Sequence, residues 1–521
     1  SAFAKNPDGQ FEHGAAAYEK RGTAVTVPTW DAEKCIQCNQ CAFVCSHATI
    51  RPFMLDEAEV KAAPEQTKLA DTKPKAGEYK YTMSVSPLDC MGCGECITVC
   101  PVGAIEMVPQ ESQADQQPVF DYLVANVGKK PGMPADNTVK GSQFNQPLLE
   151  FSGSCAGCAE TSYARLITQL FGEHMYISNA TGCSSIWGGP AATSPYTVNK
   201  DSKKGPAWAN SLFEDNAEHG FGMEIGQKVL REQAIASAKK CAESDKASAE
   251  LKAAFDKFEE TKNDTKANTP ATEALVAELE KAAAAGCPDA KDALDKKNYL
   301  AKKSVWIFGG DGWAYDIGYG GVDHVLASDH DVNVLVLDTE VYSNTGGQSS
   351  KATPTAAIAQ FAAAGKRTKK KDLGMMAISY GYVYVAQVAM GADKNQLMKA
   401  MTEAEAYHGP SLVICYAPCI NHGIRKGMGK SQLEEKLAVE CGYWDLFRYN
   451  PDLKAQGKNP FSLDSKEPDY SKFQEFLQGE VRYASLKKGF PEEADALYAK
   501  TEQDAKNRRE SYVRLQKGFE D

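Results

Sequence analysis

Two stretches of sequence, CIQCNQCAFVC (residues 35–45) and CMGCGECITVCP (residues 90–101), contain eight of the sixteen cysteines of the 521-residue chain. Each has the spacing Cys-x2-Cys-x2-Cys-x3-Cys, the run that ligates a pair of [4Fe-4S] clusters. Three thiolates at this spacing wrap one cubane through a tight loop, and the fourth points toward the other cluster. We therefore predict crossed ligation, with Cys35, Cys38, Cys41 and Cys100 on one cluster and Cys90, Cys93, Cys96 and Cys45 on the other.

Zinc is the main alternative, because four evenly spaced cysteines could close one zinc site in each run. The Cys100-Pro101 ending and the small residues between the ligands favour iron–sulfur chemistry over zinc knuckles or disulfides. Ser46 stands where the second run has Pro101. A proline there only shapes the chain after the ligand, so the prediction is unchanged.

Composition limits the class of protein. The net charge of -11 argues against nucleic-acid binding. No apolar run approaches the roughly 20 residues of a membrane span, and the opening SAFAKNPDGQFEHG has no signal-peptide core. Cysteine-ligated clusters need reduced thiols, so we expect a cytoplasmic protein without a disulfide framework. The chain lacks an initiator Met and opens in loop-like sequence, which predicts a piece of something longer.

Apolar runs and helical stretches alternate in the larger part of the chain. Strand-like runs occupy Val305 to Phe308, Val332 to Leu337 and Leu412 to Tyr416, and helical patterns occupy Pro354 to Ala364 and Lys394 to Tyr407. This alternation is typical of a doubly wound α/β domain. We predict a linker from an absent upstream domain (1–30), a small α+β two-cluster ferredoxin-like domain (31–120), a connector (121–147), the α/β domain (148–447) and a helical tail (448–521).

Residues 225–300 are rich in Ala, Lys and Glu and have apolar residues at helical spacing. We predict a helical hairpin inserted into the α/β domain. Cys241 and Cys287, one on each arm, are expected to be free thiols, and Cys415 is expected to lie in the core of a strand. The basic run from Lys366 to Lys371 is compatible with steering of an acidic partner, although a solvated face is the favoured interpretation.

Four further cysteines are placed among small residues. Cys155 and Cys158 lie in FSGSCAGCAE, Cys183 lies in NATGCSS, and Cys419 lies in CYAPCINHG. A Cys-x2-Cys pair alone is compatible with a redox dithiol, a zinc half-site or a cluster half-site. These segments lie at the edges of predicted elements, where backbone N–H groups are free to bond cluster sulfides, which favours a cluster.

A third signal is Gly310-Asp311-Gly312, directly after an apolar strand. About thirty residues later a second strand ends in DTEVYSNTGG (residues 338–347). Two strand ends that each deliver an oxygen ligand suit Mg2+ bound to a diphosphate. The spacing is that of thiamine diphosphate enzymes, with Thr339 in place of their usual Asn.

The chain resembles the pyruvate:ferredoxin oxidoreductases. The resemblance runs through EKRGTAV, CIQCNQCAFVC, FSGSCAGCAE, NATGCSSIWGG, FGGDGWAYDIGYGG, DTEVYSNTGGQSSKATP, KRTKKKDLGMM and YAPCINHGI, and it covers nearly everything except the helical insertion and the tail. It implies a thiamine diphosphate-binding α/β domain whose Mg2+ is held by Asp311, Thr339 and the Val341 carbonyl. It also implies a third [4Fe-4S] cluster on Cys155, Cys158, Cys183 and Cys419.

The same resemblance implies the remaining site residues. Asn344 faces the substrate and is the predicted catalytic residue. The residues expected to contact thiamine diphosphate are Glu160, Cys183, Gly310, Asp311, Gly312, Trp313, Thr339, Glu340, Val341, Tyr342, Ser343 and Asn344.

The reaction that the resemblance implies is the oxidative decarboxylation of pyruvate with coenzyme A, with electrons passed through three clusters to ferredoxin or flavodoxin. The family also implies a homodimer and upstream domains that activate the cofactor. Two alternatives stay open, namely another 2-oxoacid:ferredoxin oxidoreductase and a pure electron-transfer polyferredoxin.

Overall fold

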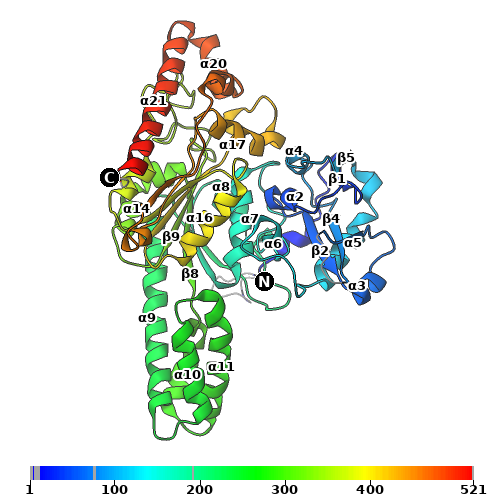
Figure 1. Ribbon diagram of the computed structural model, residues 1–521, viewed down its shortest axis with the longest axis vertical. Coiled ribbons are helices and arrows are strands. Elements are labelled where there is room, and N and C mark those ends of the chain that lie inside the picture. The colour runs from blue at the N-terminus through cyan, green and yellow to red at the C-terminus, as the bar shows by residue number, and fades with distance from the viewer. Residues whose placement is uncertain (1–3, 5–11, 74–77, 191–192, 519–521) are drawn as a thin grey trace.

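The computed structural model of the chain describes residue 4 and residues 12–73, 78–190 and 193–518. A small module lies beside a larger domain built on one sheet, and a helical bundle extends away from that sheet (Figure 1). The predicted linker over residues 1–30 therefore falls partly outside the described residues.

The small module contains two antiparallel sheets. One pairs β1 (Thr26–Trp30) with β5 (Ile105–Pro109), and the other has the order β2-β4-β3. Its remaining elements are β2 (Ile50–Leu55), β3 (Ala70–Asp71), β4 (Lys80–Val85), α2 (Gln40–Val44), α3 (Glu57–Ala62) and α4 (Glu95–Thr98).

Both predicted boundaries of this module were wrong by a few residues. Strand β1 pairs along its whole length with β5, so residues 26–30 belong to the module and not to a linker. Helix α5 (Gln116–Asn126) crosses the predicted boundary at residue 120 because Val119 and Leu123 pack with Leu55 of β2.

The larger domain has an eight-stranded sheet in the order β13-β12-β10-β11-β9-β8-β6-β7. The six strands from β10 to β7 are parallel, and β12 and β13 join antiparallel at one edge. The bounds are β6 (Met175–Ala180), β7 (Ala207–Ser211), β8 (Ser304–Gly310), β9 (Asn333–Asp338), β10 (Tyr384–Val388), β11 (Ser411–Tyr416), β12 (Phe447–Tyr449) and β13 (Phe461–Leu463).

Helices cover both faces of this sheet, which confirms the doubly wound α/β fold. Trp306 and Phe308 of β8 pack with α7 (Ala159–Phe171) and α16 (Lys394–Ala406), whereas Val305 and Ile307 pack on the opposite face. The helices of that opposite face include α14 (Tyr319–Leu326) and α15 (Leu373–Ile378). Two further helices, α8 (Cys183–Gly188) and α17 (Ser431–Glu440), follow β6 and β11 in the chain.

The three predicted strand runs are confirmed by β8, β9 and β11, and the second predicted helix is confirmed by α16. The helix predicted over Pro354 to Ala364 was wrong. Ala356 and Phe361 adopt left-handed backbone angles, and Ala356 N–H donates to the Lys366 carbonyl, so the segment folds back on itself instead of coiling.

The inserted segment is helical, as predicted, and lies between β7 and β8. Figure 1 shows it extending away from the sheet. Leu251, Phe255 and Phe258 form its core with Leu275 and Leu279. Its helices are α9 (Asn216–Glu243), α10 (Ala249–Thr261), α11 (Thr265–Ala284), α12 (Pro288–Asp295) and α13 (Lys297–Leu300).

The segment predicted as a helical tail is only partly helical. Strands β12 and β13 belong to the main sheet, and the helices that follow are α19 (Phe473–Gln478), α20 (Val481–Gly489) and α21 (Pro491–Lys517). The sequence analysis missed both strands because each is only three residues long and lies in a proline-rich segment. Among the described residues, no helix combines the length and the apolar character needed to cross a membrane.

Candidate cofactor and cluster sites

The two cysteine runs of the small module form matching loops. In each run the residues that separate the first three cysteines adopt positive φ angles, at Gln37 and Asn39 in the first and at Gly92 and Gly94 in the second. Left-handed residues turn the backbone sharply, and glycine does so without a steric cost. Short helices then begin, and they present Cys41 and Cys96 toward the module interior.

The electrostatics show which cysteines lie together. The pKa of the Cys41 thiol is raised by burial and then by Cys38, Cys35 and Cys100. Burial also raises the pKa of Cys96, and among its other causes are the neighbouring thiols Cys93, Cys41, Cys45 and Cys90. The structure thus places Cys100 of the second run near Cys41, and Cys45 of the first run near Cys96. The assignment of two clusters to these sets stays a prediction.

The second group of cysteines converges beside the carboxyl edge of the sheet. Cys183 is the first residue of α8 after β6, Cys419 follows β11, and Cys158 directly precedes α7. Burial is the largest cause of the raised pKa of Cys158, and Glu160 and Cys419 add to it. Burial raises the pKa of Cys419 to about 11, with contributions from Glu160 and Cys155. All four predicted ligands of the third cluster therefore lie in one neighbourhood.

Within the described part of the chain, no three His, Cys, Asp or Glu side chains are grouped to hold a single metal ion. A cubane does not require such a group, because it takes one thiolate on each of four irons.

The predicted magnesium ligands meet between β8 and β9. Thr339 Oγ1 lies 2.9 Å from Asp311 Oδ1 and 3.0 Å from the Val341 carbonyl oxygen. Ligands at about 2.1 Å from an octahedral ion are about 3.0 Å apart along each edge. The donor set, one carboxylate, one hydroxyl and one carbonyl, therefore fits Mg2+ in both chemistry and spacing.

Asp311 is buried, and among the described residues no cationic side chain forms an ion pair with it, although the charge of Lys370 acts on it from further away. Burial and the Asp338 carboxylate raise the pKa of Asp311 to about 8, although Ser350 Oγ donates to its second oxygen at 2.6 Å. A divalent cation at this place would stabilise the charged carboxylate.

Most of the residues predicted to contact the cofactor line one cavity. Eleven of the twelve line it, and only Glu340 does not. Glu160 accepts a 2.9 Å hydrogen bond from Trp187 Nε1, and burial raises its pKa to about 7. Cys183 Sγ lies 3.3 Å from Ser343 Oγ, and Asn344 is exposed at the rim. The cavity thus connects the metal loop, which is the segment after β9 that carries Thr339 and Val341, with the second cysteine group.

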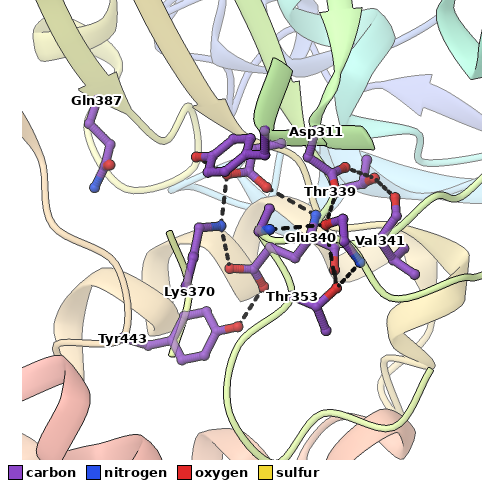
Figure 2. Close-up of polar contacts among 12 residues, drawn as sticks. Asp311, Thr339, Glu340, Val341, Thr353, Lys370, Gln387 and Tyr443 are labelled. Carbon is purple, nitrogen blue, oxygen red and sulfur yellow. Dashed lines mark hydrogen bonds and ion pairs between the residues drawn. The ribbon is translucent and has the colours of Figure 1, made fainter. Parts of the chain in front are cut away.

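Glu340, which was predicted to contact the cofactor, does not line this cavity. Its carboxylate is 1% exposed and points away from the cavity, toward Lys370, Arg482 and Tyr443 (Figure 2). These three residues were missed by sequence reasoning because they come from separate parts of the chain, namely the basic run, the turn between α17 and β12, and α20. His422, whose Nε2 lies 2.6 Å from the Thr339 carbonyl, was also missed.

The prediction that the basic run is a solvated face was wrong for three of its lysines. Lys366 Nζ donates to the Ser350 carbonyl at 2.7 Å, and Lys370 forms ion pairs while its side chain is 11% exposed. Lys371 Nζ donates to the Tyr315 carbonyl at 3.1 Å. Lys366, Lys370 and Lys371 are thus partly buried, whereas Arg367, Thr368 and Lys369 between them are exposed.

Two family models match the chain. Residues 34–104 match the 4Fe-4S dicluster domain, and residues 282–415 match the C-terminal TPP binding domain of thiamine pyrophosphate enzymes. The first match covers both cysteine runs, and the second covers Asp311 and Thr339. The chain therefore has a two-cluster iron–sulfur domain and a thiamine diphosphate-binding domain.

Curated relatives match over nearly the whole chain. It is 56% identical over 520 residues to a pyruvate-flavodoxin oxidoreductase of Klebsiella pneumoniae and 57% identical over 522 residues to a pyruvate:ferredoxin oxidoreductase of Moorella thermoacetica. A mitochondrial pyruvate dehydrogenase [NADP(+)] of Euglena gracilis is 45% identical over 98% of this chain and 28% of its own length. The first two alignments cover 99% and 98% of this chain but 44% of each relative, so the chain spans less than half of their length. Over the length that it shares with them, the chain belongs to the family of pyruvate-flavodoxin and pyruvate:ferredoxin oxidoreductases.

Proposed function

We propose that the chain provides the thiamine diphosphate–Mg2+ half-site and the electron pathway of an enzyme that converts pyruvate and coenzyme A to acetyl-CoA and CO2. Ferredoxin or flavodoxin receives the electrons, and the enzyme acts in the cytoplasm, where thiols stay reduced during cluster assembly. One observation carries the proposal. A single cavity is lined both by the converging oxygens of Asp311, Thr339 and Val341 and by Cys183 of the second cysteine group.

The residues of this cavity have distinct roles in the proposal. Asp311, Thr339 and Val341 hold Mg2+, which binds the diphosphate. Thiamine diphosphate, when bound, supplies the electron sink for decarboxylation. Asn344 contacts the substrate from the exposed rim. Glu160 is held by Trp187 and stays a positioning group in the wall.

The small module is docked where electrons would leave the cavity. Ser162 Oγ of α7 donates to the Val44 carbonyl at 3.0 Å, and Ser431 Oγ lies within hydrogen-bond distance of both Glu95 Oε1 (2.7 Å) and the Gly157 carbonyl oxygen (2.9 Å). These contacts join both cysteine-bearing helices of the module to the neighbourhood of Cys158. They support a relay from the third cluster to the two clusters of the module.

The relatives are more than twice as long as this chain, and we propose that their remaining part supplies the group that activates the cofactor and the residues that select the 2-oxoacid. Another 2-oxoacid is therefore the nearest alternative substrate. A polyferredoxin that keeps the α/β domain only as a scaffold is disfavoured by the intact spacing of Asp311, Thr339 and Val341.

The proposal is tested on anaerobically reconstituted chain. It predicts about twelve irons per chain and saturable, Mg2+-dependent binding of thiamine diphosphate. Retention of about eight irons, with Cys155 and Cys419 open to alkylation, would remove the third cluster. Normal iron content without any binding of thiamine diphosphate would favour the polyferredoxin.

A further inference from the structure

Glu340 separates two of the proposed metal ligands and has an unusual backbone. Its φ of 59° places it in the left-handed region, which costs a residue with a Cβ atom some energy. The left-handed turn brings Thr339 Oγ1 and the Val341 carbonyl to the same side, 3.0 Å apart. The contacts that keep Glu340 in this conformation therefore also set the distance between the Thr339 hydroxyl and the Val341 carbonyl.

The Glu340 side chain is fixed from three directions. Lys370 Nζ lies 2.9 Å from Oε1, and Arg482 Nη2 lies 2.8 Å from Oε2, which also accepts from the Tyr443 hydroxyl. The Glu340 carbonyl accepts from Thr353 Oγ1 at 2.6 Å. Figure 2 shows Lys370 and Tyr443 on one side of Glu340, and Asp311 and Val341 on the other.

Lys370 also fixes the residue that precedes the loop. Its Nζ lies 2.7 Å from Asp338 Oδ2, and Asp338 Oδ1 accepts from the Glu340 N–H at 3.0 Å. Thr339 is thus held between two carboxylates that share one ammonium group. None of Lys370, Tyr443 and Arg482 lines the cavity, so none of them is placed to touch the metal or the diphosphate.

We propose that Lys370, Tyr443 and Arg482 are positioning residues for the divalent cation, acting through Glu340 to preset the Thr339 and Val341 oxygens at the spacing that the cation requires. Buried ion pairs and hydrogen bonds to a charged group are strong enough to hold a strained residue. The inference rests on the proposed function only in taking these oxygens and Asp311 as the magnesium site.

The test measures metal affinity separately from stability. Mn2+ is titrated into the full chain with thiamine diphosphate, and free Mn2+ is followed by its EPR signal. Tyr443→Phe removes one donor to Glu340 and should weaken Mn2+ binding at least about fivefold. Lys370→Met should weaken it more. If Lys370→Met does not fold, Tyr443→Phe decides the question.

Matched controls come from the same domain. Tyr384→Phe removes a buried hydroxyl that donates to Glu403 Oε2 at 2.9 Å, away from the metal loop, and Lys369→Met changes an exposed lysine next to Lys370. Both controls should bind Mn2+ within twofold of the unmodified chain. One result would overturn the proposal. If Tyr443→Phe lowers the thermal midpoint as much as Tyr384→Phe does but leaves the affinity for Mn2+ unchanged, then the role of Tyr443 is purely structural. Absence of saturable Mn2+ binding in the unmodified chain would instead reject the metal site itself.

Discussion

The crossed ligation of the small module makes a quantitative prediction. Cys100 lies with Cys35, Cys38 and Cys41, so the pair of changes Cys35→Ala and Cys100→Ala should damage one cluster. The pair Cys90→Ala and Cys100→Ala should damage two, because Cys90 belongs to the other set. The unmodified chain should have three reducible clusters, each of which gives one EPR signal after reduction. About two signals should remain in the Cys35/Cys100 double variant, and about one should remain in the Cys90/Cys100 double variant.

The assay is spin quantification by EPR after anaerobic reduction, together with iron analysis of the same samples. Cys415→Ala is the control, since this buried cysteine lies in β11 and in neither set, and it should keep all three signals. The reasoning fails if the order of the two pairs is reversed, with two signals left by the Cys90 pair and one by the Cys35 pair. That result would mean that each run holds a cluster with its own four cysteines.

Asp311→Ala removes the only carboxylate of the metal site and should weaken thiamine diphosphate binding at least about 100-fold at unchanged iron content; fluorescence titration measures it, and normal affinity would refute the metal assignment. Cys241 and Cys287 are 46 positions apart in the sequence and have Sγ atoms 2.8 Å apart, so oxidised glutathione should link them and stabilise the bundle by about 4 kcal/mol against urea, a gain that Cys287→Ser must abolish. Burial raises the pKa of Glu405 to about 7, so stability is lost as the pH rises from the unfolded value near 4.5 toward 7, by at most about 3 kcal/mol. Glu405→Gln should therefore raise the thermal midpoint at pH 8 and not at pH 4.5, and an equal shift at both pH values would contradict the pKa assignment.

The sequence pattern predicted correctly those features that depend on residues close together in the chain. The apolar runs that became β8, β9 and β11 are buried on both faces of a parallel sheet, and such strands read as continuous apolar sequence. The cysteine runs were equally readable, because cluster ligation demands a fixed spacing. The metal ligands Asp311 and Thr339 followed from strand ends and from the family resemblance.

The errors share one physical cause, which is a partner far away in sequence. Lys370 looks like part of a solvated basic run, yet its largely covered side chain pairs with Asp338 and Glu340 some thirty residues earlier. Arg482 reaches Glu340 across 142 residues. The segment from Pro354 to Ala364 has helical composition, but its backbone bonds to Lys366 and Arg482 instead. No periodicity within a short window carries that information.

Helix α7 has a consequence for the kinetics of the proposed electron pathway. It begins one residue after Cys158, every one of its residues is buried, and Ser162 and Arg165 donate to backbone carbonyls of the cysteine-bearing module. The gap between the second cysteine group and the module is therefore set by one rigid helix and by buried bonds that dissolved ions do not screen. Electron movement inside the chain should proceed equally fast in dilute buffer and in concentrated salt. Delivery to a separate charged carrier depends on encounter, and its rate changes with ionic strength because salt screens the charges of both partners. The salt dependence of turnover thus identifies which of these two steps sets the overall rate.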